Sequence, residues 1–293
     1  MLFRAIAYLC FGLLTCSAAP VWAPKEKETV VLLGDTFFER DYNYGLIETA
    51  LTIATAGKQI RFRNLGWSGD TPRCESRSYF GPPAEGFDRL RKQLAEIKPT
   101  TVIACYGAVD AFQGEAGITP FLKSYSTLIA MIRETPGVTV ILVTPPAASN
   151  DVPRWPSLKG HLALREMYAK AITDFGKEQQ LPVADLFSMM KNESWKTING
   201  VTLTEEDYQK VAPLVAKALG LEIQPKKLAQ PSLKETIIAK NRLFFQRWRP
   251  QNEIYLFGSR KHEQGKNGAE IPTFDPLIAE KETLIFGTFP SSR

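Results

Sequence analysis

The chain of 293 residues has a formal net charge of +5, with 44% hydrophobic and 23% charged residues. This composition is typical of a globular protein with a full core, and it excludes a disordered or fibrous chain. The basic clusters at residues 225–227 and 259–262 are too short to predict nucleic-acid binding, two histidines are too few for a His-rich metal centre, and no cofactor or metal is expected.

The first 23 residues have the pattern of a secretory signal peptide. Arg4 supplies a thin positive region, residues 5–14 an apolar core, and residues 17–19 small side chains for cleavage. We therefore expect residues 1–23 to be removed and the chain to be exported, periplasmic or secreted, with no stable membrane span afterwards. An uncleaved N-terminal anchor and a lipoprotein acylated on Cys16 are the alternatives.

Removal of that segment leaves two cysteines, Cys74 and Cys105. Export permits a disulfide between them. The interpretation we favour is that Cys105 is a small apolar residue inside a buried strand.

Apolar and alternating runs predict five strands, at residues 30–33, 60–64, 101–105, 138–143 and 183–186. Apolar residues at helical spacing predict helices between them, at 44–56, 87–97, 119–132, 162–175 and 204–218. Thr119-Pro120 is a predicted helix start, and Thr204-Glu-Glu-Asp207 resembles a capping box. Strands that alternate with helices form βαβ units, so we predict an α/β fold with a five-stranded parallel sheet covered on both faces.

The alternation ends near Leu221. We interpret residues 24–221 as the sheet domain and residues 222–293 as a helical and irregular C-terminal extension that wraps onto it without a second core. Ser232-Leu-Lys-Glu235 is a second predicted capping box, opening a helix that runs to Trp248. Within the remaining tail, residues 254–257 are strand-like.

Three glycine-containing loops follow the first three predicted strands, and a fourth polar segment precedes the last helix of the sheet domain. They are residues 34–36, 66–71, 107–110 and 199–203. In order and spacing they resemble the sequence blocks of SGNH (GDSL) hydrolases, which are esterases and lipases on a flavodoxin-like three-layer fold. The resemblance covers about residues 28–221 and is most specific at 64–71. The extension is similar to tails on some SGNH proteins of planctomycete-type bacteria.

The resemblance implies a role for five positions. The family's nucleophilic serine falls on Thr36, its oxyanion-hole glycine on Gly69, and its second oxyanion donor, an asparagine, on Val109. The closing block, which supplies an acid and a base in the family, falls on Asn199 and Thr202. Gly69 keeps the family residue type, and Thr36 keeps a hydroxyl.

These replacements decide what chemistry we expect. A hydroxyl needs an adjacent base to act as a nucleophile, and Thr202 accepts no proton at neutral pH. Asn199 carries no charge to stabilise an imidazolium, and the Val109 side chain has no donor for an oxyanion. The sequence therefore predicts that ester hydrolysis is lost or weak.

Only two histidines are available as a substitute base. We interpret His161 as a surface or capping residue, because it lies just before a predicted helix. His262 lies in the extension beside Glu263, and a tail that folds back over the strand ends would bring it to Thr36 as a speculative base.

Further polar and aromatic residues flank these positions. Asp35 and Asp110 are possible general bases, although we favour a role in fixing loop geometry. Together with Trp67 and Ser68 of the second loop, they form the expected ligand contacts.

Three functions remain open on the sequence alone. The first is a degenerate SGNH protein, weakly active or a ligand-binding pseudoenzyme, whose small-molecule or carbohydrate ester ligand is inferred by family analogy. The second is an active esterase that uses Thr36 with an unconventional base such as His262. The third is a structural or interaction module in which the extension contacts a partner. The oligomeric state is left open.

Overall fold

The structure, a computed structural model, describes residues 20–79, 81–223, 230–263, 265 and 267–289. Most of the predicted signal peptide and the basic cluster at 225–227 lie outside the described residues. Among the helices of the described part, none combines the length and the apolar character needed to cross a bilayer.

The centre of the molecule is a five-stranded parallel sheet in the order β2-β1-β3-β4-β5. Its strands are β1 (Thr29–Gly34), β2 (Arg61–Asn64), β3 (Thr101–Cys105), β4 (Thr139–Val143) and β5 (Val183–Ala184). Every residue of β1 and β3 is buried, which is the pattern of strands covered on both faces. The predicted fold class is confirmed.

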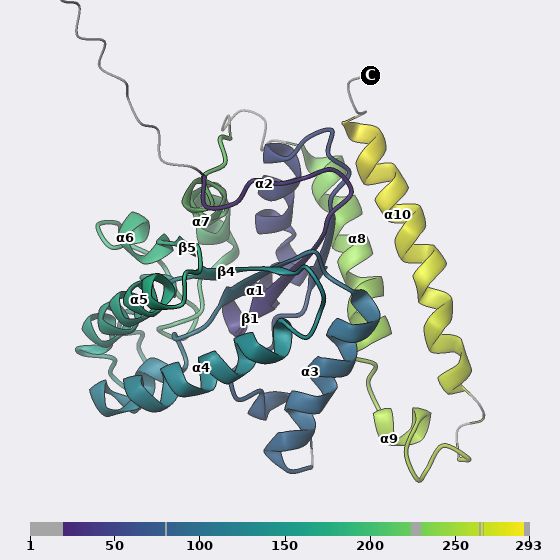
Figure 1. Cartoon of the computed structure of the whole chain (residues 1–293), viewed down its shortest axis with the longest axis horizontal. Coiled ribbons are helices and arrows are strands. Elements are labelled where there is room, and N and C mark those ends of the chain that lie inside the picture. Colours follow the sequence, from purple (N-terminus) through teal and green to yellow (C-terminus); the bar gives the residue numbers. More distant parts are fainter. Residues whose placement is uncertain (1–19, 80, 224–229, 264, 266, 290–293) are drawn as a thin grey trace, which may run out of the picture.

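Successive residues of each strand point to opposite faces of the sheet, so each strand contributes to two apolar layers. Leu32 and Ile103 pack with α1 (Thr36–Tyr44), α2 (Leu46–Ala54) and α7 (Glu205–Ala218). Val31 and Val102 pack on the opposite face with α3 (Pro83–Ile97), α4 (Ile118–Ile132) and α5 (His161–Glu178). Figure 1 shows the sheet between these two groups of helices.

Two long helices of the extension cover the β2 edge of the sheet. Helices α8 (Pro231–Trp248) and α10 (Phe274–Thr288) lie side by side, and α8 contacts α1, α2 and β2 (Figure 1). The buried Lys240 of α8 forms an ion pair with Glu48 of α2 and donates to the Phe62 carbonyl at 3.0 Å. A helix that uses edge carbonyls of β2 in this way protects an edge strand from pairing with another chain.

Local predictions were wrong at four places. Residues 254–257 were expected as a strand, but they fall largely in the short helix α9 (Glu253–Leu256). Helix α8 begins at Pro231, so Ser232 lies inside its first turn and is not a cap. Helix α4 begins one residue before Thr119. The segment expected as one helix from 44 to 56 begins at Leu46, because Gly45 ends α1 with a left-handed φ of 62°.

The other predicted cap is present. The Thr204 hydroxyl accepts a hydrogen bond from the Asp207 amide at the start of α7.

Cys74 and Cys105 are both buried and free, so the disulfide considered between them is not formed. The remaining short elements are α6 (Leu186–Met190), η1 (Glu75–Arg77), η2 (Asp110–Gln113), η3 (Glu115–Gly117) and η5 (Asn267–Thr273).

Candidate functional site

The turn from β1 into α1 sets the position of the first candidate residues. Asp35 is 2% exposed and caps α1, because its Oδ1 accepts the Phe37 amide at 2.9 Å. Thr36 is the first residue of that helix. A capped helix start fixes the backbone of both residues at the carboxyl end of β1, where ligands bind in open α/β sheets.

The second loop meets this turn through a direct hydrogen bond. The Gly69 amide donates to Thr36 Oγ1 at 3.0 Å. Gly69 has φ of 70°, a left-handed conformation that favours glycine. The hydroxyl at the nucleophile position and the amide at the oxyanion position therefore contact each other.

Close packing holds the second loop against α1. A Cβ on Gly66 would lie 2.3 Å from the Glu39 amide nitrogen, so only glycine allows this approach. Asn64 Nδ2 donates to the Phe38 carbonyl at 2.6 Å, and Ser68 Oγ donates to Glu39 Oε2 at 2.9 Å. Ser68 thus contacts α1 in this structure.

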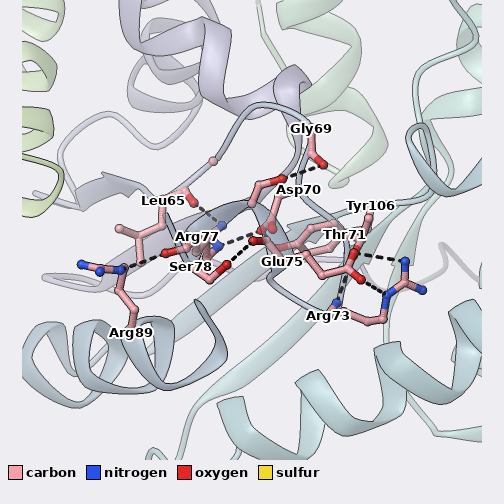
Figure 2. A network of polar contacts seen from close by, with 12 residues as sticks. Leu65, Gly69, Asp70, Thr71, Arg73, Glu75, Arg77, Ser78, Arg89 and Tyr106 are labelled. Atoms are coloured by element: carbon pink, nitrogen blue, oxygen red, sulfur yellow. Dashed lines mark hydrogen bonds and ion pairs between the residues drawn. The ribbon is translucent and has the colours of Figure 1, made fainter. Parts of the chain in front are cut away.

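A buried ion pair supports the same loop from below. Arg77 Nε donates to Asp70 Oδ2 at 2.7 Å, Arg77 Nη2 donates to the Leu65 carbonyl at 2.8 Å, and Tyr106 Oη donates to Asp70 Oδ2 at 3.2 Å (Figure 2). Both members of the pair are at most 1% exposed. Burial opposes the charge of Arg77, but the neighbouring Asp70 raises its pKa overall. Burial also raises the pKa of Asp70, and the Arg77 charge opposes that shift.

A small cavity of about 50 Å³ lies at the carboxyl edge of the sheet and brings three of the predicted positions together. Thr36, Val109 and Thr202 line it from three separate segments of the chain. The remaining lining residues are Asp35, Phe37, Ala108, Phe112, Pro146, Arg165, Val201, Leu203 and Tyr208.

Asn199 takes part through the backbone of its own loop. Its Oδ1 accepts the Thr202 amide at 2.9 Å and the Val201 amide at 3.3 Å. This arrangement closes a turn, as short amide side chains commonly do. Asn199 therefore shapes the segment that carries Thr202 to the cavity.

Arg165 also lines the cavity, although no sequence pattern indicated it. Its side chain is 2% exposed, and Nη1 donates to the Pro146 and Ala148 carbonyls at 3.1 and 2.6 Å. Its Nε is buried and has no hydrogen-bond partner within the described part of the chain. Burial lowers the pKa of Arg165 to about 10, and the Asp35 charge opposes that shift. A buried cation of this kind favours negative or strongly polar ligand atoms nearby.

His161 was expected at the surface or as a helix cap, but it is 5% exposed and is the first residue of α5, after the cap position Gly160, so both expectations were wrong. The ring packs on Phe112, with centroids 4.1 Å apart, and Phe112 lines the cavity. Nδ1 lies 3.1 Å from Ser149 Oγ, and Nε2 is buried with no partner. Burial lowers the pKa of His161 to about 4.

Two buried carboxyl groups flank the same edge of the sheet. Burial raises the pKa of Asp35 to about 6, although the Phe37 amide lowers it in part. Burial raises the pKa of Asp110 to about 7, and the Asp35 charge adds to this shift. Both Asp110 oxygens and Asp35 Oδ2 are buried and have no hydrogen-bond partner among the residues that the structure describes. Asp110 is not among the residues that line the small cavity.

Two other candidates lie away from the cavity lining. Trp67 is 6% exposed and packs between the guanidinium groups of Arg77 and Arg249, at 5.3 and 3.5 Å from its ring centroid. His262 is exposed, in the extension after α9, and forms no hydrogen bond within the part of the chain that is described. The side chains that line the cavity therefore include neither histidine.

Comparison with family models finds one match. The model of the GDSL-like lipase/acylhydrolase family matches residues 34–206, which is more than half of the chain. This match confirms the resemblance that the glycine loops indicate. A search of curated proteins finds no match.

Solved structures with the same fold include several esterases. BT4096, a gut microbial diltiazem-metabolizing enzyme, has a TM-score of 0.55 at 15% identity. The match covers 69% of this chain and 49% of that enzyme, so this chain spans about half of the enzyme's length. A catalytic mutant of the acetylxylan esterase Axe2 from Geobacillus stearothermophilus has a TM-score of 0.52 at 13% identity, covering 68% of this chain and 97% of that one. LAE5, an alpha/beta hydrolase from the metagenome of Lake Arreo, Spain, has a TM-score of 0.52 at 16% identity, covering 69% and 98%. At these identities the likeness shows the fold alone.

Proposed function

The chain belongs to the GDSL-like lipase/acylhydrolase family, and we propose that it is an exported member in which the ester-hydrolysing groups are degraded and the cleft binds a small acylated ligand. The export part of this proposal rests on the signal-peptide pattern of residues 1–23.

The hydrogen bond between the Gly69 amide and Thr36 Oγ1 is the observation that carries the proposal. A threonine hydroxyl becomes a nucleophile when a base accepts its proton. Within the described residues, Thr36 Oγ1 forms no hydrogen bond with a histidine or a carboxylate, and Thr202, which lines the same cavity at the family's base position, has no basic atom. The hydroxyl is thus held by a donor and lacks an acceptor for its proton.

The lining opposite Thr36 supports the same conclusion. Val109 offers only an apolar side chain where the family has an asparagine amide. Loss of one such oxyanion donor costs about 3–4 kcal/mol of transition-state stabilisation in a protease with this type of hole. The Gly69 amide alone remains in place.

The size and charge of the cavity indicate what it accepts. A cavity of about 50 Å³ holds a group of a few atoms, such as acetyl, while the rest of a ligand lies outside it. Arg165, whose Nε has no hydrogen-bond partner among the described residues, supplies a donor for a carbonyl oxygen. By analogy with the acetylxylan esterase that shares the fold, we propose an acetylated carbohydrate as the ligand class.

The test uses the purified chain from Pro20 onward, which keeps the buried Trp22. We expect saturable binding of acetylated xylo-oligosaccharides, weaker binding of the deacetylated sugars, and no turnover of 4-nitrophenyl acetate above the buffer rate. Thr36→Ala should weaken binding, because Thr36 lines the cavity and its hydroxyl holds the second loop in place through the Gly69 amide. Turnover by the unmodified chain that Thr36→Ala abolishes would contradict the proposal, as would equal affinity for acetylated and deacetylated sugars.

A second candidate function is slow hydrolysis with Asp35 as the base. The observation in its favour is that Asp35 adjoins Thr36, lines the cavity with a free Oδ2, and has a pKa raised by burial to about 6. A group that titrates there can accept a proton at neutral pH. This function predicts a turnover that rises with pH through about 6 and is lost in both Asp35→Asn and Thr36→Ala. His262, the base considered from the sequence, is not among the lining residues.

A further inference from the structure

A second and larger cavity lies where the extension meets the sheet domain. It measures about 660 Å³, a volume typical of small-molecule sites. Its walls come from the segment between η1 and α3 and from the end of α8 through α9, and include Tyr79, Arg89, Phe245, Arg249, Glu253 and Phe257. It shares no lining residue with the small cavity at Thr36.

Arg249, at the end of α8, is the most informative residue of this wall. Its guanidinium stacks on Trp67 at 3.5 Å and on Phe245 at 4.7 Å, measured to the ring centroids. Contacts with two aromatic rings restrict the orientation of the planar group. Since the side chain is 20% exposed while lining the cavity, part of it remains accessible from there.

The hydrogen-bonding capacity of this guanidinium is unused. Among the described residues, no side-chain hydrogen bond involves Arg249; its closest carboxylate is Glu39, with Nη1 to Oε1 at 3.9 Å. Burial lowers the pKa of Arg249, and the Glu39 charge opposes the shift. Five N–H donors on an arginine are normally matched by acceptors when the group is largely buried, so an acceptor is missing here.

The other arginine of the cavity shows the contrast. Arg89 Nε donates to the Arg77 carbonyl at 3.0 Å, and its Nη1 donates to Glu253 Oε1 at 2.6 Å. Its guanidinium also lies over Tyr79 at 4.6 Å from the ring centroid. Arg89 therefore already has hydrogen-bond acceptors within the protein, and Arg249 is the arginine available to a ligand.

The remaining walls are apolar and accessible. Tyr79, Ile254 and Phe257 are 46%, 48% and 51% exposed, which is unusual for large apolar side chains gathered around one cavity. Such surface favours the apolar body of a ligand.

The charges of the lining limit the charge of the ligand. The positive charges of Arg89 and Arg249 are matched by the negative charges of Glu85 and Glu253. A lining that is neutral overall, with one guanidinium that forms no side-chain hydrogen bond among the described residues, suits a single negative charge better than the two of a phosphate monoester.

We propose that this cavity binds a small organic monocarboxylate with an apolar body, whose carboxylate pairs with the Arg249 guanidinium while its body lies against Ile254 and Phe257. A carboxylate matches the planar fork of arginine with two parallel hydrogen bonds. This site is separate from the acyl-binding cleft proposed above.

Titration calorimetry on the full chain tests the proposal with 3-phenylpropionate and octanoate as probes. Both should bind saturably, and 3-phenylpropanol, which lacks the charge, should bind about tenfold or more weakly, as expected for loss of a charged hydrogen bond. Phenyl phosphate should bind more weakly than 3-phenylpropionate. Arg249→Gln should weaken carboxylate binding about tenfold or more for the same reason.

Two further variants guard against an effect of misfolding. Phe257→Ser changes an exposed residue and should also weaken the binding of both carboxylates, with thermal unfolding unchanged. Arg91→Gln is the matched control, because Arg91 stacks on Phe87 outside this cavity, and binding should be unaffected.

The following outcomes would overturn the proposal: absence of saturable binding, equal affinity for the acid and the alcohol, tighter binding of phenyl phosphate, or binding that survives both Arg249→Gln and Phe257→Ser. Thr36→Ala should leave carboxylate binding intact, so failure here is distinguishable from failure of the proposed acyl cleft.

Discussion

Two buried arginine–aspartate couples lie at the carboxyl edge of the sheet, and they differ in how their charges are paired. Arg77 and Asp70 form a direct ion pair at 2.7 Å. Arg165 and Asp35 influence each other's pKa values, yet no ion pair within 4 Å joins them in the part of the chain that is described. Asp70 raises the pKa of Arg77, whereas burial lowers that of Arg165 to about 10.

This difference indicates that the first couple has a structural role and that the second couple belongs to the candidate site. In the first couple the two charges pair with each other inside the protein, and the pair fixes the loop that presents Gly69 (Figure 2). The second keeps Arg165 Nε and Asp35 Oδ2 without partners beside the small cavity, where a ligand or water can use them. Buried polar groups without partners are costly and commonly mark functional positions.

The largest effect should come from breaking the first couple. Asp70→Asn leaves the Arg77 charge buried and unpaired, so the free energy of unfolding should fall by about 3–5 kcal/mol. Urea unfolding measures this. The double variant Asp70→Leu with Arg77→Met, which removes both charges, should recover most of the loss; a single variant as stable as the parent would mean that the pair contributes little.

In the second couple, the buried Asp35 should make the free energy of unfolding depend on pH. Because burial raises the pKa of Asp35 to about 6 in the folded chain, its stabilising contribution is fully present below the unfolded value of 3.8 and is lost as pH rises through about 6. A shift of this size corresponds to about 3 kcal/mol at most. Asp35→Asn should therefore flatten the fall in unfolding free energy between pH 4 and 7.

The control for this prediction is Asp174→Asn, because Asp174 is a surface carboxyl whose pKa is lowered by Lys170. Asp174→Asn should leave the fall in unfolding free energy between pH 4 and 7 as steep as in the parent. Parallel pH profiles for the parent and Asp35→Asn would show that Asp35 titrates normally in the folded chain.

A smaller effect is expected from the loop that the first couple supports. Gly69→Ala places a side chain at φ of 70°, which costs about 1–2 kcal/mol, although the space around it is open. Gly137→Ala, at φ of 73° with no neighbour within 4 Å, is a matched control and should cost the same. Binding of the acetylated ligand should be weakened by Gly69→Ala alone. If both variants bind the acetylated ligand with equal affinity, Gly69 does not contribute to the site.

The smallest effect should come from the cavity itself. Thr202→Val keeps the shape of a residue whose hydroxyl forms no hydrogen bond among the described residues, so the unfolding free energy should change by about 0.5 kcal/mol or less. A loss of several kcal/mol in urea unfolding would reveal a structural role for that hydroxyl.

The sheet could be predicted from the sequence, because apolar strands and glycine turns are local signals. The meeting of Thr36, Val109 and Thr202 at one edge was implied by the resemblance to SGNH hydrolases. The Arg165 contacts could not, since its burial depends on carbonyls at 146 and 148 that a short local pattern does not reveal. The same holds for His161, which is covered by Phe112. Residues 254–257 looked like a strand because four residues are too few to distinguish strand from helix spacing.

The most direct test of the account is to restore the family residues in one chain: Thr36→Ser, Val109→Asn, Asn199→Asp and Thr202→His. If the fold is intact and only the proton-handling groups are missing, this variant should hydrolyse 4-nitrophenyl acetate about 10²-fold or more faster than the parent. A parent that already matches the restored variant, and loses its turnover in Thr36→Ala, would contradict the claim that hydrolysis has been lost.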